Sequence, residues 1–182
     1  MALGGADALN FTKQLDESAA RGTPLIGGSV TVDGALVEGL GARANGIVSA
    51  GPVAVLDTPE YKAYDAAFKK AFPDAGPPGV FDLGYYVEMK SLLQGLESAK
   101  GDTSGDQATL RTALSSLAWT TPIGPVKLDE NRQAIAKNYL FKVTDGSSQL
   151  ISTVTDVNQT LGFPRAEYIQ QPANDRDNPS CP

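Results

Sequence analysis

The chain has 182 residues, enough for one large domain or two small ones, and 41% of them are hydrophobic, so it can bury a core. Its formal net charge of −6 argues against nucleic acid as a partner, because neutralising phosphates requires clustered lysine and arginine. Histidine is absent and Cys181 is the single cysteine, which excludes Ser-His-Asp and Cys-His catalysis, histidine-ligated metals and an internal disulfide. No apolar run approaches the ~20 residues of a membrane span, and residues 1–5 show no signal peptide.

The first part of the chain alternates short strands with helices. Residues 1–5 are typical of the end of a strand, and Asp7 is a plausible N-cap for a helix that ends at Gly22. The elements predicted next are a buried strand over residues 23–28, a helix over residues 33–40 and a strand over residues 46–52. Strand–helix alternation favours a parallel sheet with helices on its faces, so the predicted fold class is α/β.

A helical stretch follows. Thr58 and Pro59 form a strong helix start, because a capping hydroxyl precedes proline at the first helical position. An aromatic stripe on this helix has the spacing of a core-packing face: Tyr61, Tyr64, Phe68 and Phe72. A second long helix carries its large apolar residues on one side, namely Tyr85, Met89, Leu92, Leu93 and Leu96. Asp106 can cap a third helix.

From Ala118 onward the hydrophobic period changes to two, which indicates strands. Tyr139, Phe141 and Val143 alternate with Leu140, Lys142 and Thr144. Asp145-Gly146 is a good hairpin turn into residues 149–151. Residues 162–182 are rich in proline, asparagine and aspartate and are expected to form an irregular tail on the surface.

Three stretches of sequence, taken in order, carry a family resemblance. They are Gly4-Gly5-Ala6-Asp7 with Pro24-Leu25-Ile26-Gly27-Gly28; Gly46-Ile47-Val48 with Thr58-Pro59 and Gly84-Tyr85; and Thr121-Pro122-Ile123-Gly124-Pro125-Val126 with Asp129-Glu130-Asn131. Together they resemble the type I periplasmic-binding family that serves ABC transporters of the branched-chain amino acid class. The similarity covers nearly the whole chain, and its third stretch is the most specific. It implies a three-layer α/β/α fold in which two lobes, joined by hinge strands, hold a ligand in a cleft.

This resemblance places the chain in the C-terminal portion of such a protein, so the fold would be incomplete. Residues 1–52 would belong to the second ligand-binding lobe, residues 53–118 to a helical section of the first lobe, residues 119–161 to a β-rich crossing and return segment, and residues 162–182 to the tail. The amino-terminal strands of the first lobe would be encoded elsewhere, together with a pairing partner for Cys181. An incomplete lobe exposes sheet edges and apolar helix faces, so self-association is also expected.

Two loops that follow strands are candidates for ligand binding, because ligands of open α/β sheets bind beyond the carboxyl ends of the strands. The candidate residues are Gly5, Ala6 and Asp7, then Ser29, Val30 and Thr31, and also Tyr85 near a helix start. Glycine lets a ligand approach the backbone, and the two hydroxyls can donate and accept hydrogen bonds. Simpler interpretations stay open, with Asp7 acting only as a cap and the hydroxyls only satisfying a turn.

The resemblance also bears on the ligand. Amino-acid binders of this family often place a carboxylate where this chain has Ser29, so a plain α-amino acid is less favoured. Residues 176–181 resemble the tail of members that take up aromatic or other organic acids and amides. The tail therefore favours an organic acid or an amide, and a branched-chain amino acid-like solute stays open.

The leading hypothesis is an extracytoplasmic solute-binding component of an ABC transporter, which captures a small organic solute between two lobes and catalyses nothing. That solute would be branched-chain amino acid-like, an amide, or an aromatic or other organic acid. It would be periplasmic or extracellular, would meet a membrane permease, and would need neither a cofactor nor a metal. A ligand-sensing or regulatory module of the same fold is an alternative. A hydrolase that uses paired carboxylates is another, although no spacing singles out a pair.

Overall fold

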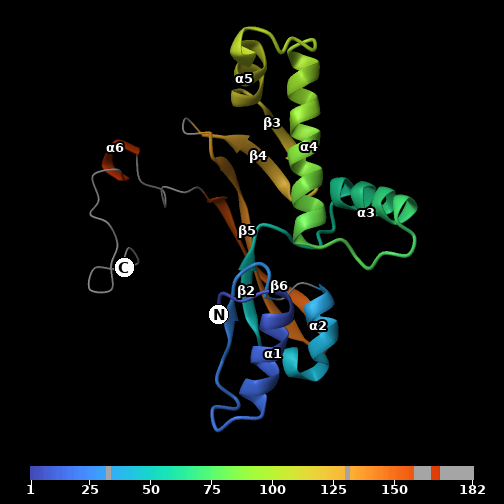
Figure 1. The fold of residues 1–182 in the computed structure, drawn as a ribbon, viewed down its shortest axis with the longest axis vertical. Coiled ribbons are helices and arrows are strands. Elements are labelled where there is room, and N and C mark those ends of the chain that lie inside the picture. Colours follow the sequence, from blue (N-terminus) through green and yellow to red (C-terminus); the bar gives the residue numbers. More distant parts are fainter. Residues whose placement is uncertain (32–33, 130–131, 158–164, 169–182) are drawn as a thin grey trace.

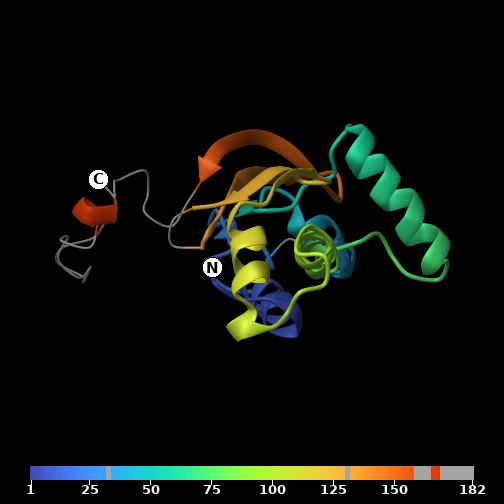
Figure 2. The ribbon, with the colours of Figure 1, turned by 90° about the horizontal axis from the view of Figure 1, so that it is seen from above.

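The computed structural model describes residues 1–31, 34–129, 132–157 and 165–168, and these form two bodies stacked along the long axis of the molecule (Figure 1). The lower body consists of α1 (Gly5–Asp16), β1 (Ile26–Gly27), α2 (Gly34–Leu40), the 3-10 helix η1 (Gly41–Ala44) and β2 (Val48–Gly51). The upper body consists of α3 (Pro59–Ala71), α4 (Val80–Ser98), the 3-10 helix η2 (Gly105–Gln107), α5 (Ala108–Ser115), β3 (Ala118–Thr121) and β4 (Gly124–Leu128). Two long strands, β5 (Ala134–Thr144) and β6 (Ser147–Val157), run between the bodies (Figure 1). Seen from above, helices α1, α4 and α5 lie on the same side of these strands (Figure 2).

The sheet explains how the two bodies are joined. Its order is β1-β2-β5-β4-β3, with β6 paired to β5, and only β1 and β2 are parallel among the described pairs. The start of β5 pairs with β4 through Ala134 and Ile135, whereas its later part pairs with β2 through residues 139–142. One strand therefore belongs to both bodies, and the α/β class predicted from the sequence is confirmed.

The lower body is held by a small apolar core between its helices and the sheet. The buried members are Ala8, Leu36, Val37, Leu40, Ala44, Ile47 and Val143. Backbone bonds reinforce this contact, because the Gly46 amide donates to the Val143 carbonyl at 2.9 Å and the Val143 amide donates to the Ile47 carbonyl at 2.9 Å. The end of β5 is thereby fixed against η1 and β2.

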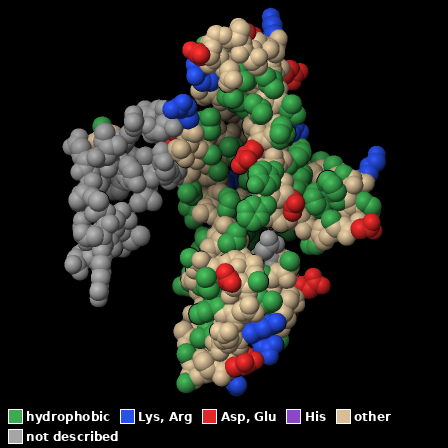
Figure 3. Space-filling view, in the orientation of Figure 1, with side chains coloured by type: hydrophobic (Ala, Val, Ile, Leu, Met, Phe, Trp, Pro, Cys, Tyr) green, Lys and Arg blue, Asp and Glu red, His purple; other side chains and the backbone are tan. Residues whose placement is uncertain are grey.

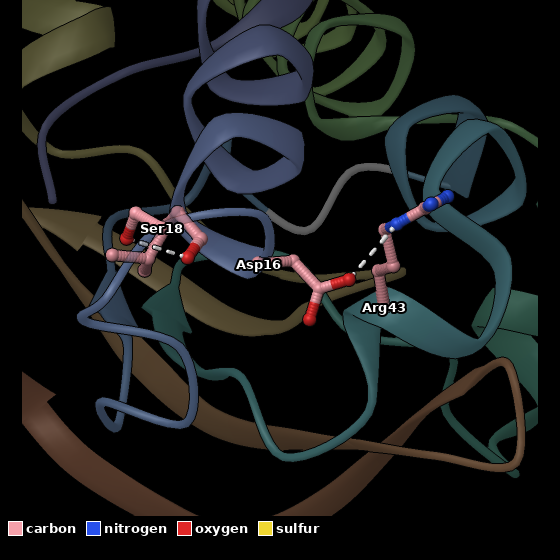
Figure 4. A network of polar contacts seen from close by, with 4 residues as sticks. Asp16, Ser18 and Arg43 are labelled. Carbon is pink, nitrogen blue, oxygen red and sulfur yellow. Dashed lines mark hydrogen bonds and ion pairs between the residues drawn. The ribbon is translucent and has the colours of Figure 1, made fainter.

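The prediction for the first helix was wrong at both ends. Gly4, not Asp7, is the N-cap, and residues 1–4 form no strand. The helix ends at Asp16, well before Gly22, because the Ser18 hydroxyl donates to the Leu15 carbonyl at 2.9 Å and accepts from the Ala20 amide at 3.1 Å. Such local side-chain bonds compete with helix continuation. Figure 4 shows this turn beside the 3.2 Å ion pair of Asp16 with Arg43, which ties the helix end to η1.

In the upper body, α3 begins as the sequence predicts. The Tyr61 amide donates to the Thr58 side-chain oxygen at 3.2 Å, and Pro59 occupies the first turn. The predicted cap of the third helix was wrong: Asp106 lies inside η2 with a φ of 53°, and Gln107 is the N-cap of α5. Helices α4 and α5 pack closely at Gly95, where an added Cβ would lie 2.4 Å from Leu114 Cδ2.

The hairpin between β5 and β6 is also as predicted. Asp145 and Gly146 both have positive φ, 50° and 73°, which is the conformation of a two-residue turn that matches strand twist. Beyond this turn, β6 is exposed over nearly its whole length, with Leu150, Ile151 and Val154 at 44%, 55% and 46%. The short helix α6 (Arg165–Tyr168) is the described part of the predicted tail, whose other residues lie outside the described ranges.

Candidate functional site

A hollow of about 430 Å³ lies where the two bodies meet. Ser29 and Gly51 contribute to its wall from the carboxyl ends of the parallel strands, and Tyr61 contributes from α3. Pro78, from the loop before α4, and Phe141, on β5, line it as well. A concave site at the ends of strands and between two bodies is a general location for small-molecule binding in α/β proteins.

The wall of this hollow is apolar with a few hydroxyl groups. Serine hydroxyls come from Ser29, Ser147 and Ser148, and no Asp, Glu, Lys or Arg is among its lining residues in the part of the chain described. Burial, and secondarily the negative charge of Asp65, raises the pKa of Tyr61, so its hydroxyl stays protonated at neutral pH and can donate. The wall can therefore bury a ring or aliphatic group and orient a polar group, but it supplies no counter-ion.

The loop that presents Ser29 is fixed by its neighbours. The Ser49 hydroxyl donates to the Gly28 carbonyl at 2.9 Å, and the Thr31 amide donates to the same carbonyl at 3.0 Å. Glycines make room for this loop: a Cβ on Gly51 would lie 2.8 Å from the Ser29 Cβ, and one on Gly27 would lie 2.4 Å from Thr31 Cγ2. Residues with a side chain at either place would push the loop away from the strand ends.

The structure separates the predicted site residues. Ser29 lines the hollow, but Gly5, Ala6 and Asp7 do not; they are exposed on the first turn of α1. Thr31 is fully buried and its hydroxyl donates to the Leu3 carbonyl at 3.0 Å, so this group joins the two loops rather than facing a ligand. Val30 is half-buried beside Gly4, whose added Cβ would lie 2.9 Å from Val30 Cγ2.

Tyr85 lies away from this hollow. It is 68% exposed on α4 and lines a different groove, between α3 and α4. Among the described residues, Tyr85 and Ser29 therefore line different hollows. The bond of the Thr31 hydroxyl to the Leu3 carbonyl holds the loop after β1 against the segment that precedes α1.

Sequence reasoning missed several lining residues. Tyr61 was assigned only to a core stripe, and Phe141 only to a strand, although both face the hollow. The break at Pro77-Pro78-Gly79 was a usable signal, because a segment without regular structure that follows a helix often borders a site. Local sequence patterns do not show which of these segments packs beside β2, because that depends on the tertiary structure.

Three kinds of feature are absent from the part of the chain that the structure describes. Its buried polar residues are Thr12, Thr31, Ser49 and Thr121, so no described aspartate or glutamate is buried. No group of three or more metal-ligating side chains occurs within the same ranges. No described helix is both long and apolar enough to cross a membrane.

Comparison with known proteins defines the class to which this fold and site belong. Residues 1–148 match the model of the family described as "Periplasmic binding protein". The solute-binding protein of an R. palustris ABC transporter, solved with benzoate, is 25% identical with a TM-score of 0.76, over 88% of this chain and 44% of that chain. A solute-binding protein from Rhodopseudomonas palustris BisB5, solved with 3,4-dihydroxybenzoic acid, is 27% identical with a TM-score of 0.73, over 86% of this chain and 44% of that chain.

The chain belongs to the periplasmic binding protein family, whose members compared here are solute-binding proteins of ABC transporters. The leucine-binding protein LivK from Thermotoga maritima shares the fold at 18% identity and a TM-score of 0.69, over 85% of this chain and 43% of that one. The chain thus spans less than half the length of these structural neighbours. The search of curated proteins gave no match.

Proposed function

We propose that the chain is part of the extracytoplasmic solute-binding component of an ABC transporter and forms one wall of its ligand site. The observation that carries this proposal is the hollow at the junction of the two bodies, with Ser29 on its wall. Closure of the bodies around a solute would exclude water and present a defined surface to a membrane permease. The protein would act in the periplasm or outside the cell, and it would bind without catalysing a reaction.

The connectivity supports a division of the chain into parts of two lobes. Residues 1–52 would form part of the second lobe, residues 53–118 the helical section of the first lobe, residues 119–161 the crossing and return segment, and residues 162–182 the tail. The double pairing of β5, to β4 at one end and to β2 at the other, is the observation that supports this division.

The chemistry of the wall favours an aromatic or other organic acid over an amino acid. A carboxylate is the strongest acceptor for an α-ammonium group, and no carboxylate is among the described lining residues. A ring can instead be buried against Phe141 and the aliphatic residues, with a carboxylate accepting from the hydroxyls of Ser29 and Tyr61. The neighbours that are at least 25% identical and were solved with benzoate or hydroxybenzoates support the same class.

Ligand-induced stabilisation of the 182-residue chain tests this proposal. Benzoate, 4-hydroxybenzoate and 3,4-dihydroxybenzoate would be compared with leucine and isoleucine by thermal melting. A ligand at 100 times its dissociation constant stabilises the native state by about 2.7 kcal/mol, which is easily resolved. We expect a rise in melting temperature with at least one aromatic acid and none with the amino acids.

A matched pair of serine variants then tests whether the ligand-induced rise in melting temperature comes from binding in the hollow. Ser29→Ala should reduce the ligand-induced shift, since a donor on the wall is lost. Ser98→Ala, at the exposed end of α4, should leave the shift unchanged. No shift with any aromatic acid, or an equal response of both variants, would contradict the proposed site.

A further inference from the structure

Two dipeptides that end in glycine, far apart in the sequence, are hydrogen-bonded to each other's segment in the lower body. Asn45-Gly46 follows η1, and Asp145-Gly146 is the turn between β5 and β6. The Gly146 amide donates to the Asn45 side-chain oxygen at 3.2 Å, across 101 positions of sequence. In the opposite direction, the Gly46 amide donates to the Val143 carbonyl at 2.9 Å, just before the same turn. Each glycine amide is therefore bonded to the segment of the other dipeptide.

Both dipeptides have the chemistry that forms a succinimide ring. Glycine has no side chain to hinder its own amide, so an asparagine or aspartate before it is open to attack. At Asn45, the Gly46 nitrogen loses its proton and bonds to the side-chain carbon Cγ, while the bond from Cγ to Nδ2 breaks and ammonia leaves. Water then opens the ring. Cleavage between the nitrogen and Cγ gives aspartate, and cleavage between the nitrogen and the main-chain carbonyl carbon gives isoaspartate. Asp145-Gly146 forms the same ring by losing water, which it regains when the ring opens.

The fold requires these residues in spite of their chemistry. Gly46 has a φ of 89° and Gly146 a φ of 73°, which is the region that favours glycine. Asn45 supplies the acceptor for the Gly146 amide. Both dipeptides are exposed, so the water that opens the ring can reach them. On the face drawn in Figure 3, hydrophobic side chains gather mainly over the upper body, whereas the lower body presents more polar and charged groups.

The hydrogen bonds hold both nitrogens that would attack. The Gly46 amide must leave the Val143 carbonyl before it can lose its proton. The ψ of Asn45 is 132°, which turns the Gly46 nitrogen away from the Asn45 side chain, so the peptide must also rotate. The Gly146 amide must likewise leave the Asn45 side chain. A hydrogen-bonded amide of this kind reacts only from a locally open state of the fold.

We infer that Asn45-Gly46 is a site of spontaneous deamidation coupled to Asp145-Gly146, so that conversion of Asn45 to isoaspartate releases the Gly146 amide and allows Asp145 to isomerise. Asn45 reacts first, because a neutral carboxamide is attacked more readily than the carboxylate that an aspartate carries at neutral pH. Isoaspartate routes the main chain through the former side chain, so the acceptor of the Gly146 amide is displaced. This inference does not depend on solute binding.

The extra methylene of isoaspartate also lies between two residues fixed in the core of the lower body. Ala44 and Ile47 are 0% and 3% exposed, and both belong to that core. A longer main chain between them displaces one of them or breaks the bond from Gly46 to Val143. Gly146 also lines the hollow, so the change reaches the wall of the candidate ligand site.

Incubation of the whole 182-residue chain at mildly alkaline pH, with and without urea, tests whether the fold protects Asn45. The peptides that contain residues 45 and 145 would be quantified by liquid chromatography and mass spectrometry, which separates isoaspartate from aspartate. We expect deamidation at Asn45 in both samples, at least about 10-fold slower without urea, because the Gly46 amide is freed only by local opening. Equal rates would show that the fold does not hold the nitrogen. No product at all in the folded chain, while the chain in urea reacts, would show that the site does not open. Either result overturns the inference.

Three substitutions test the coupling between the two dipeptides. Asn45→Ala removes the acceptor of the Gly146 amide and should speed isomerisation of Asp145 in the folded chain by about 3- to 10-fold, the effect of one hydrogen bond. Asn45→Asp keeps a side-chain oxygen as acceptor and should leave that rate near the parent value. Asn10→Ala, at an exposed asparagine of α1, is the matched control and should leave the rate unchanged.

Circular dichroism first establishes that each variant is folded. Faster isomerisation of Asp145 in Asn45→Ala, but not in the other two variants, supports the coupling. No acceleration in Asn45→Ala, or an equal acceleration in Asn10→Ala, overturns it. If Asn45→Ala does not fold, the time course of the parent chain decides, because coupling requires isomerisation of Asp145 to lag behind modification of Asn45. Simultaneous appearance of the two products would then overturn the inference.

Discussion

Replacing Gly27 with alanine is expected to destabilise the lower body strongly, although it adds a single methyl group. The new Cβ would lie 2.4 Å from Thr31 Cγ2, 2.5 Å from Thr31 Cβ and 2.6 Å from Thr31 Oγ1. Rotation of the threonine side chain cannot relieve the contact with its Cβ, so the backbone of the loop must move. That movement strains the hydrogen bond of the Thr31 hydroxyl to the Leu3 carbonyl.

The expected loss of stability is the sum of the steric clash and the strained hydrogen bond. Overpacking a tight site costs about 1–3 kcal/mol, and a lost hydrogen bond adds about 1 kcal/mol. We therefore expect Gly27→Ala to lower the free energy of unfolding by about 2–4 kcal/mol, a large fraction of the stability of a small domain. Urea unfolding followed by circular dichroism measures this as a lower midpoint at an unchanged m-value.

The neighbouring glycine provides the matched control. An added Cβ on Gly28 meets no atom within 4 Å, so Gly28→Ala should change the free energy of unfolding by no more than about 0.5 kcal/mol. If the two alanine variants unfold at the same urea concentration, then the close approach of β1 to the Ser29–Thr31 loop is not the reason for glycine at position 27.

Three further predictions concern the upper body and β5. Thr58→Ala should lower the free energy of unfolding by about 1 kcal/mol, because the Tyr61 amide loses its side-chain acceptor; Thr58→Ser, which retains the acceptor, should remain near the parent value by the same denaturation assay. Tyr139→Phe should cost about 1–2 kcal/mol, since this buried hydroxyl donates to the Ile123 carbonyl at 2.7 Å; an unchanged midpoint would show that the carbonyl finds another donor. Stability should also fall as the pH rises from about 10 to about 12. Burial raises the pKa of Tyr64 to about 12 in the folded chain, against 10.0 in the unfolded chain, so the unfolded chain ionises first. The contribution of Tyr64 to the free energy of unfolding is therefore fully present below pH 10.0 and is lost over this range. Melting across this pH range in Tyr64→Phe, which should show a smaller decline, checks the assignment.

Elements with strong local signals could be predicted from the sequence. Thr58-Pro59 starts α3, and Asp145-Gly146 turns β5 into β6, because capping and positive φ are properties of the residues themselves. The strand expected over residues 46–52 is β2. In each case the interactions that decide the conformation lie within a few residues of one another.

The predictions that were wrong concern residues whose conformation depends on contacts with distant parts of the chain or on competing local hydrogen bonds. The end of α1 was misplaced because the Ser18 hydroxyl bonds to the neighbouring backbone at Leu15 and Ala20, and such local bonds compete with helix continuation. Of the candidate site residues, only Ser29 lines the hollow, since Thr31 bonds to Leu3, which is 28 positions away. No periodicity or motif reports such a pairing.

On the aromatic stripe of α3 and the apolar side of α4, the predicted burial differs from the observed exposure. The periodicity predicted that Phe72 packs in a core, as Tyr61 and Tyr64 do, but Phe72 is 57% exposed, and so is Met89 on the facing helix. An apolar stripe on a helix predicts which face of the helix is buried. The exposed fraction shows only how far the described residues bury that face. The two agree at Leu83 and Val87, which are buried. They disagree along the groove and also outside it, where Leu92 is 37% exposed. Helical periodicity therefore predicts that α3 and α4 have an apolar face, but it does not predict which part of that face the described residues cover.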